Sequence, residues 1–201
     1  MSDQQPGINP ATRNDEAMRF LLTRRSRPAK TLVLPVPDRA ALTEILTAGA
    51  RTPDHGKLEP WRFVVLARPA LERLAARAGT IARADGLPDD QVTKAASQFA
   101  GSHCCVVVIG CPQQSDKVPA LEQQLSAGAV CLSTLNAALA TGWGANWLTG
   151  WAATNAQFCR EVLGLEGEEW VAGFIHIGTE GATPPERPRP DLTSITQWID
   201  E

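Results

Sequence analysis

CCVVVI, the stretch from Cys104 to Ile109, is an unbroken apolar run and decides the fold class of this 201-residue chain. An apolar run without alternation predicts a central β-strand that is covered on both faces. Trp170–Ile177 (WVAGFIHI) predicts a second strong strand, and Trp61–Leu66 and Gly144–Leu148 predict shorter ones. Helical patterns separate these strands, so the sequence predicts an α/β or α+β fold.

Start and stop signals mark the helices between the strands. Asn14 and Asp38 are candidate N-caps in front of apolar stripes, and prolines open several of the other helices. The predicted helices begin or extend over residues 14–25, 38–49, from 69 onward, 88–100, 119–141 and 155–163. Residues 1–13 are expected to be a disordered extension and residues 14–201 a single domain, whose last twenty residues form a β-compatible trailing arm.

The longest predicted helix, Pro119–Thr141, has an unusual composition. It is rich in Ala, Gly and Ser and is apolar on most of its circumference, with Gly142 as its left-handed cap. Such a helix is expected to be buried all round, and small residues allow close helix–helix approach. In a chain of this size a second copy would have to cover one side, which predicts a homodimer interface of about 2,000 Å² or more.

Charge and composition disfavour several classes of protein. The formal net charge is −3, and the cations around Arg24–Arg27 form the densest basic cluster, so a nucleic-acid partner is not expected. The N-terminus lacks the apolar segment of a secretory signal. The longest weakly polar stretch, Ala127–Ala140, is too short to span a bilayer. We therefore expect a cytoplasmic protein without a membrane partner.

The five cysteines have no CxxC spacing. Cys104, Cys105 and Cys111 lie in or beside the apolar run and are interpreted as core residues. A metal site with His103, or a disulfide framework, is the less favoured alternative, so no metal is expected. The sequence also lacks GxSxG, HExxH, a P-loop and a GxGxxG turn after a strand.

Three clusters remain as candidates for ligand binding. Arg24-Arg25-Ser26 ends the first helix and could clamp a phosphate through charge-assisted hydrogen bonds, although basic residues also favour helix C-termini without any ligand. The loop with Arg51, Asp54, His55 and Lys57 could recognise a polar heterocycle, or be a solvated turn. The stretch Gly142–Gly150 could approach a flat ligand closely, or be a tight turn with buried tryptophans.

Taken together and in this order, the three clusters resemble the nitroreductase family, and within it the short YdjA-like branch. The matching stretches are TRRS (23–26), EILTAGARTPDH (44–55), EPWRFVV (59–65), KVPALEQQLSAG (117–128), TGWGANWLTG (141–150) and VAGFIHIGT (171–179). The resemblance covers about residues 15–201. It implies an α+β fold with a central mixed β-sheet flanked by helices, in an intertwined homodimer with FMN at two interface sites.

The resemblance also implies roles for individual residues. Arg24, Arg25 and Ser26 would hold the phosphate and ribityl end of FMN, and Arg51 and His55 would reach the same flavin from the partner chain. Trp147, Leu148 and Thr149 would lie near the isoalloxazine ring. The residues associated with NAD(P) binding would be Ala137, Ala138, Leu139, Ala140, Thr141 and Gly142.

Two details of the phosphate end stay open at this point. The continuation Arg27-Pro28-Ala29-Lys30 departs from the common family pattern, which leaves open which cation there lies near the flavin. Arg187 or Arg189 stands where many nitroreductases have a phosphate-binding cation, and Arg187 is the predicted extra contact.

The expected activity is an FMN-dependent NAD(P)H oxidoreductase. NADH or NADPH would reduce the flavin at N5 and leave, and a nitroaromatic, quinone or related electron-poor small molecule would then enter. No side chain is assigned as catalytic, with Arg51 and His55 as possible auxiliaries that stabilise charge or supply a proton. The alternatives are dehalogenation or flavin destruction on the same scaffold, and a non-catalytic FMN-binding protein.

Overall fold

The structure is a computed structural model that describes Ile8, Asn9 and residues 11–201. The predicted disordered extension, residues 1–13, lies largely outside the described residues. The helices and strands follow the order α1–β1–α2–β2–α3–α4–β3–α5–β4–α6–α7–β5–α8, with short 3₁₀ turns at Ala29–Thr31 and His55–Lys57.

A five-stranded sheet forms the centre of the fold. The strands are β1 (Leu32–Val33), β2 (Trp61–Ala67), β3 (Cys104–Gly110), β4 (Gly144–Leu148) and β5 (Trp170–Glu180). β3 lies between β2 and β5, and β5 pairs along its other edge with β4 and then β1. All four strand pairs among the described residues are antiparallel, so the pairing within one chain is antiparallel throughout rather than mixed.

Strand β3 lies at the centre of the sheet, and every one of its residues is buried. Cys105, Val107 and Ile109 pack in one core cluster, with Phe99, Phe158 and Phe174 as its aromatic members. Val106 and Val108 belong to a second cluster on the opposite face. The apolar run CCVVVI thus supplies both cores, as an uninterrupted hydrophobic strand must when both faces of the sheet are covered.

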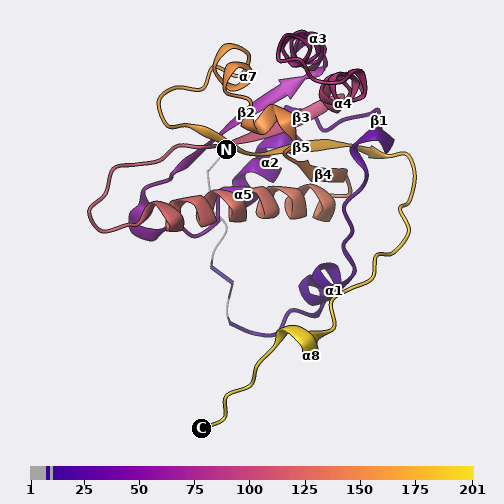
Figure 1. The fold of residues 1–201 in the computed structure, drawn as a ribbon. Coiled ribbons are helices and arrows are strands. Elements are labelled where there is room, and N and C mark those ends of the chain that lie inside the picture. Colours follow the sequence, from indigo (N-terminus) through magenta and orange to yellow (C-terminus); the bar gives the residue numbers. More distant parts are fainter. Residues whose placement is uncertain (1–7, 10) are drawn as a thin grey trace.

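Helices cover the two faces of the sheet. α3 (Arg68–Ala84), α4 (Asp89–Ala100), α6 (Trp151–Thr154) and α7 (Ala156–Glu161) are associated with the first core cluster, and α2 (Arg39–Gly49) and α5 (Ala120–Ala140) with the second. Figure 1 shows α5 on one side of the sheet and the α3–α4 pair on the other. This arrangement confirms the predicted α+β class with a central sheet flanked by helices.

Several of the described helices begin with a side-chain cap. Asn14 accepts from the Ala17 N–H at 2.9 Å, Asp38 from the Ala41 N–H at 2.9 Å, and Asn155 from the Phe158 N–H at 2.8 Å. Each cap satisfies one of the backbone donors that a helix N-terminus leaves free. α1 (Asp15–Thr23) ends two residues before the predicted Arg25, because the backbone becomes extended at Arg24.

The long helix α5 buries only one face in the single chain. Its buried residues are Gln123, Ser126, Ala127, Val130, Cys131, Thr134, Leu135 and Ala138. On the outside, Leu121 and Leu125 are each 64% exposed and Leu132 is 44% exposed. Burial all round was expected only with a second copy on one side, and the exposed side of the single chain leaves that prediction untested. Gly142 after the helix has φ +87° and confirms the predicted left-handed cap.

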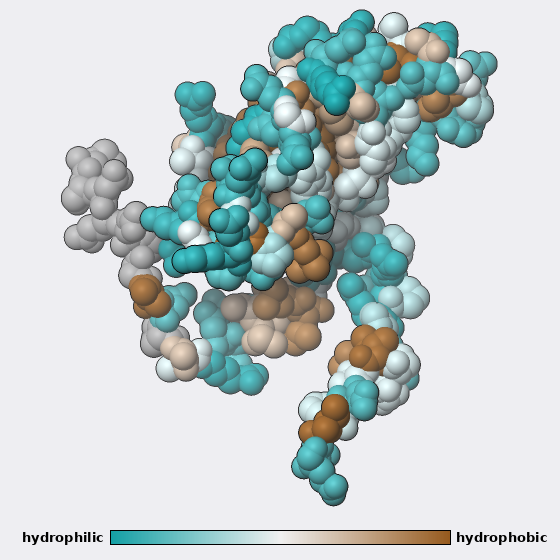
Figure 2. Space-filling view, turned by 60° about the vertical axis from the view of Figure 1, so that its left-hand side comes forward, coloured by the Kyte–Doolittle hydropathy of each residue, from teal (hydrophilic) through white to brown (hydrophobic). Residues whose placement is uncertain are grey.

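Both ends of the described chain extend away from the sheet and carry exposed apolar side chains. α1 buries no residue, and Met18, Leu21 and Leu22 of its apolar stripe are exposed. After β5 the chain continues as an arm that contains the short helix α8 (Leu192–Ile195) rather than a strand (Figure 1). Exposed hydrophobic residues, Leu192, Ile195, Trp198 and Ile199, alternate with polar ones along the last part of this arm, and its tip is hydrophilic (Figure 2). Among the described helices, none is long and apolar enough to cross a membrane.

Candidate functional site

A cavity of about 780 Å³ opens between α4, the end of β4 and the 3₁₀ turn at Ala29–Thr31. Its wall combines a short extended segment, one helix face and a strand end. The lining residues are Pro28, Ala29, Lys30, Lys94, Ser97, Gln98, Gly101, Ser102, Asn146, Trp147, Leu148, Thr149 and Gly150. The volume lies within the range of small-molecule and cofactor sites in proteins. Trp147, Leu148 and Thr149, three of the predicted ligand residues, form one edge of this cavity.

The predicted arginine cluster is fixed beside the same strand. The Arg27 N–H donates to the Ala145 carbonyl at 2.8 Å, and the Asn146 side-chain amide donates to the Arg27 carbonyl at 2.7 Å. These two bonds hold the segment after α1 against β4. Within one chain the structure therefore brings the Arg24–Ser26 cluster and the Trp147–Thr149 stretch to neighbouring positions.

The cluster holds more positive charge than its own contacts neutralise. The Arg24 Nη2 donates to Ser26 Oγ at 3.0 Å, but the Nε atoms of Arg24 and Arg25 are buried and have no hydrogen-bond partner among the described residues. Burial lowers the pKa of Arg24, and repulsion from Arg189, Arg25 and Arg27 lowers it further. Buried unpaired donors of this kind are costly, and an anion bound here would satisfy them.

The continuation Arg27–Lys30 divides its two cations between different tasks. Arg27 forms an ion pair with Glu180 at 2.6 Å, which lowers the pKa of that carboxyl. Lys30 lies on the wall of the cavity instead. The sequence left open which of these cations lies near a ligand, and in the structure Lys30 is the one that lines the cavity.

Of the two late arginines, Arg189 lies closer to the cluster. Its charge contributes to lowering the pKa of Arg24, and it pairs with Glu186 at 2.7 Å. The pKa of Glu186 is lowered mainly by a hydrogen bond from the Arg187 backbone, with smaller contributions from Arg189 and Arg25. The predicted extra phosphate contact, the Arg187 side chain, shows no comparable interaction with the cluster.

The loop with Arg51 and His55 lies apart from the cavity beside β4. His55 Nδ1 is 2.7 Å from a carboxylate oxygen of Glu122 on α5, and Arg51 is exposed. The Asp54 carboxylate accepts the N–H groups of Leu58 and Glu59 at 2.7 and 3.2 Å, so it stabilises its own loop rather than facing outward. A second hollow of about 510 Å³ lies here, and it shares no lining residue with the cavity beside β4.

The face of α4 that lines the cavity was not predicted from the sequence. Lys94, Ser97, Gln98 and Gly101 recur at helical spacing and form one wall, while Val92, Ala95 and Phe99 point into the core. A polar helix face gives no signal that separates a ligand wall from a solvated surface. Among the described residues, the charged ones on the cavity wall are Lys30 and Lys94, without a carboxylate beside them.

Comparison with known proteins assigns the chain to a family. The sequence model described as the nitroreductase family matches residues 23–179. The provisionally named NAD(P)H nitroreductase YdjA of Escherichia coli strain K12 is 34% identical over 164 residues, which cover 82% of this chain and 88% of that protein. The chain belongs to the nitroreductase family. The predicted family and the predicted enzyme class, an oxidoreductase, are thereby confirmed.

Solved structures share the fold of this nitroreductase. A nitroreductase-like protein from Bacillus cereus superposes with a TM-score of 0.74 at 20% identity and covers 97% of this chain and 100% of that chain. A provisionally assigned nitroreductase from Desulfovibrio desulfuricans, crystallised in complex with FMN, has a TM-score of 0.70 at 21% identity and covers 94% and 98% of the two chains. At these identities the likeness shows the fold alone.

The segment predicted to bind NAD(P) ends the long helix of this nitroreductase. Ala138 is completely buried, and Ala137 and Leu139 pack against the second core cluster. The Thr141 hydroxyl donates to carbonyl groups of the preceding turn. Ala140, Thr141 and Gly142 are exposed and are the three residues of this segment that a ligand could reach.

A buried histidine lies directly behind the cavity wall. The Ser102 hydroxyl oxygen lies 2.8 Å from His176 Nδ1 and 3.2 Å from the Cys104 carbonyl oxygen, within hydrogen-bond distance of both. His176 Nε2 is buried and has no partner among the described residues. Burial lowers the pKa of His176 to about 4, so the ring stays neutral at physiological pH.

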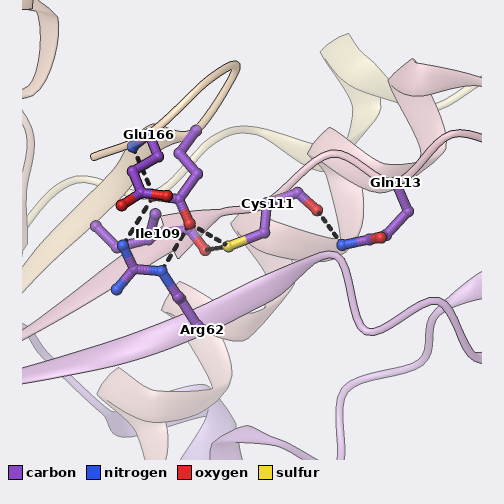
Figure 3. Close-up of polar contacts among 6 residues, drawn as sticks. Arg62, Ile109, Cys111, Gln113 and Glu166 are labelled. Carbon is purple, nitrogen blue, oxygen red and sulfur yellow. Dashed lines mark hydrogen bonds and ion pairs between the residues drawn. The ribbon is translucent and has the colours of Figure 1, made fainter. Parts of the chain in front are cut away.

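The cysteines of this nitroreductase are poor candidates for chemistry. Burial raises the pKa of Cys104 to about 11 and that of Cys131 to about 12, and a protonated thiol is a weak nucleophile. Cys111 and Arg62 converge on the Glu169 carboxylate, at the end of the sheet where β2 and β3 meet the loop before β5 (Figure 3). The Arg62 hydrogen bonds lower the pKa of Glu169 to about 2. This cluster ties strand ends together and lies outside both hollows.

Proposed function

We propose that this chain is an FMN-dependent NAD(P)H oxidoreductase that reduces electron-poor organic acceptors, nitroaromatics and quinones among them. The observation that carries the proposal is the pair of buried, unpartnered guanidinium Nε atoms of Arg24 and Arg25 beside a cavity of cofactor size. The FMN complex of a structural neighbour and the NAD(P)H in the name of a close relative support it.

The arginine cluster fits the phosphate of FMN. Arg24, Arg25 and Ser26 offer two unsatisfied guanidinium donors and a hydroxyl, and a dianionic phosphate would relieve the repulsion that lowers the pKa of Arg24. Each charge-assisted hydrogen bond of this kind contributes about 1.5–3 kcal/mol. Arg189 is the better candidate for an additional phosphate contact than Arg187, because its charge already acts on Arg24.

The cavity beside β4 fits the ring of FMN. Trp147 offers an apolar surface for a flat ring, and Leu148, Thr149 and Gly150 offer backbone groups at its edge. Lys30 and Lys94 make the wall positive, which would stabilise negative charge on a reduced flavin. Bound FMN would supply the redox chemistry, the transfer of hydride from NAD(P)H to the acceptor, while these residues would position it.

The remaining predicted ligands would come from a second chain. The exposed leucines of α5, the apolar stripe of α1 and the apolar residues of the C-terminal arm are left uncovered in one chain, which supports an intertwined homodimer. Such a dimer would bring the Arg51–His55 loop of one protomer to the Arg24–Ser26 cluster of the other. Arg51 and His55 are accordingly proposed as FMN contacts across the interface, with Ala140–Gly142 at the NAD(P) side of the site.

A visible absorbance scan of the purified protein tests the proposal. A flavin spectrum, or its appearance when FMN is added, is expected, and anaerobic addition of NADH or NADPH should bleach it. Oxidation by a quinone or a nitroaromatic should restore the colour. A colourless protein that ignores added FMN refutes the function. If FMN binds but neither NADH nor NADPH reduces it, the chain is an FMN-binding protein and the proposed activity is refuted.

Subunit mixing tests the shared site. Homodimers of Arg24→Ala and of His55→Ala would each carry two damaged sites, but a heterodimer would combine both changes in one site and leave the other intact. Unfolding and refolding an equal mixture should therefore restore FMN binding at up to about a quarter of the sites. Mixtures that bind no more FMN than the separate variants contradict the shared-site arrangement.

A further inference from the structure

The side chain of Gln98 spans the gap between α4 and the end of β4. Its Nε2 donates to the Thr149 carbonyl at 3.2 Å, and both residues line the cavity. Lys94 lies one helical turn earlier on the same wall. Gln98 is thus a direct polar link between the helix that forms one wall and the backbone that forms the opposite edge.

The geometry of Gly150 makes this link a close one. Gly150 has φ +71°, a conformation that side chains disfavour, and a Cβ added there would lie 3.2 Å from Gln98 Oε1. The two ends of the Gln98 amide therefore contact successive residues, the nitrogen at Thr149 and the oxygen over Gly150. The turn can pack this closely against α4 because position 150 has no side chain.

We propose that Gln98 is a positioning residue that fixes the Thr149–Gly150 peptide for recognition of the flavin ring, an inference that rests on the proposed function. A trans peptide is planar and points its C=O and N–H in opposite directions. Holding the Thr149 carbonyl therefore sets the direction of the Gly150 N–H. The same bond holds α4, and with it Lys94, at a fixed distance from β4. Gln98 acts on the ligand through this backbone and this helix.

Two variants and a matched control test the role. Gln98→Leu keeps the bulk and removes the donor, and Gln98→Glu presents an ionised acceptor to the Thr149 carbonyl. Gln91→Leu makes the same change at an exposed glutamine of the same helix. FMN is added to each stripped protein, and the dissociation constant, the absorbance spectrum of the bound flavin and urea unfolding are measured.

The Gln98 variants should bind FMN about 3- to 10-fold more weakly than the wild type, the effect of one lost neutral hydrogen bond. The bound flavin should also absorb at shifted wavelengths, and the KM for the acceptor should change more than kcat. Gln91→Leu should behave as the wild type. Unchanged affinity and spectrum in both Gln98 variants overturn the inference, as does loss of folding stability with the spectrum and affinity intact. A wild type that does not bind FMN overturns the proposed function itself.

Discussion

Replacing Arg24 by methionine is expected to change the stability of the FMN-free and FMN-loaded protein in opposite directions. In the free protein the Arg24 Nε is buried without a partner, and Arg189, Arg25 and Arg27 repel its charge. Methionine keeps most of the aliphatic packing and removes both penalties. The variant also loses the hydrogen bond to Ser26. On balance the free energy of unfolding of the FMN-free protein should rise by about 0.5–1 kcal/mol, the scale of partly exposed charge interactions.

The loaded protein should lose stability because the phosphate loses a ligand. One charge-assisted hydrogen bond of about 1.5–3 kcal/mol corresponds to a dissociation constant raised about 10- to 150-fold. At an FMN concentration of about 100 times the wild-type dissociation constant, the ligand stabilises the wild type by about 2.7 kcal/mol. The same concentration would stabilise the variant by only about 1.4 kcal/mol after a tenfold loss, and about 0.4 kcal/mol after a hundredfold loss.

Urea unfolding with and without FMN measures both effects in one series. Arg19→Met is the matched control, because Arg19 is an exposed arginine of α1 whose ion pair with Glu16 is long, at 3.8 Å. The control should follow the wild type in both states. An Arg24→Met protein that is less stable without FMN, yet gains as much from FMN as the wild type, would show that Arg24 is only a helix-end cation.

Three further changes test other parts of the fold. Lowering the pH from 6.5 to about 4 should reduce the free energy of unfolding by up to about 3 kcal/mol. The buried His176 has a pKa of about 4, so over this range only the unfolded chain takes up the proton. A His176→Phe variant that loses as much stability in urea unfolding would contradict this. In Gly173→Ala the added Cβ overlaps the Trp147 ring, so FMN affinity should fall several-fold at a cost of about 1–3 kcal/mol, and unchanged tryptophan fluorescence would refute the clash. Leu125→Glu on the exposed side of α5 should give monomers on a sizing column that bind FMN weakly. Thr80→Glu on α3 is the control. A stable, FMN-loaded dimer of the Leu125 variant would exclude this side of α5 as the interface.

The fold was largely predictable because its signals are local and strong. The apolar run at Cys104–Ile109 could only be satisfied between two covered faces, and Asn14, Asp38 and Asn155 each cap a helix through bonds that span three residues. The C-terminal arm was less predictable. Of its β-compatible residues, Thr193 and Ile195 lie in the short helix α8, and among the described residues the arm forms no ladder, because strand pairing depends on an available edge rather than on propensity.

The candidate site was predictable only in part. The sequence placed ligand residues at Arg24–Ser26 and Trp147–Thr149, and these lie beside one cavity because Arg27 pairs with β4. It missed Lys94 and Gln98, because a polar helix face looks the same in sequence whether it meets water or a ligand. It also counted Asp54 among the residues of a possible ligand loop, and in the structure that carboxylate accepts the N–H groups of its own loop.

By itself, then, the sequence determined the four longer strands and the helix caps, since each follows from neighbours within a few turns of chain. The order and spacing of its motifs determined the family. Only the tertiary structure decided which cation does what. In the fold, Arg27 forms an ion pair with Glu180, and Lys30 lines the cavity. Arg189 rather than Arg187 acts on Arg24. Those assignments depend on distances between residues more than a hundred positions apart, and Coulomb interactions follow distance in space rather than along the chain.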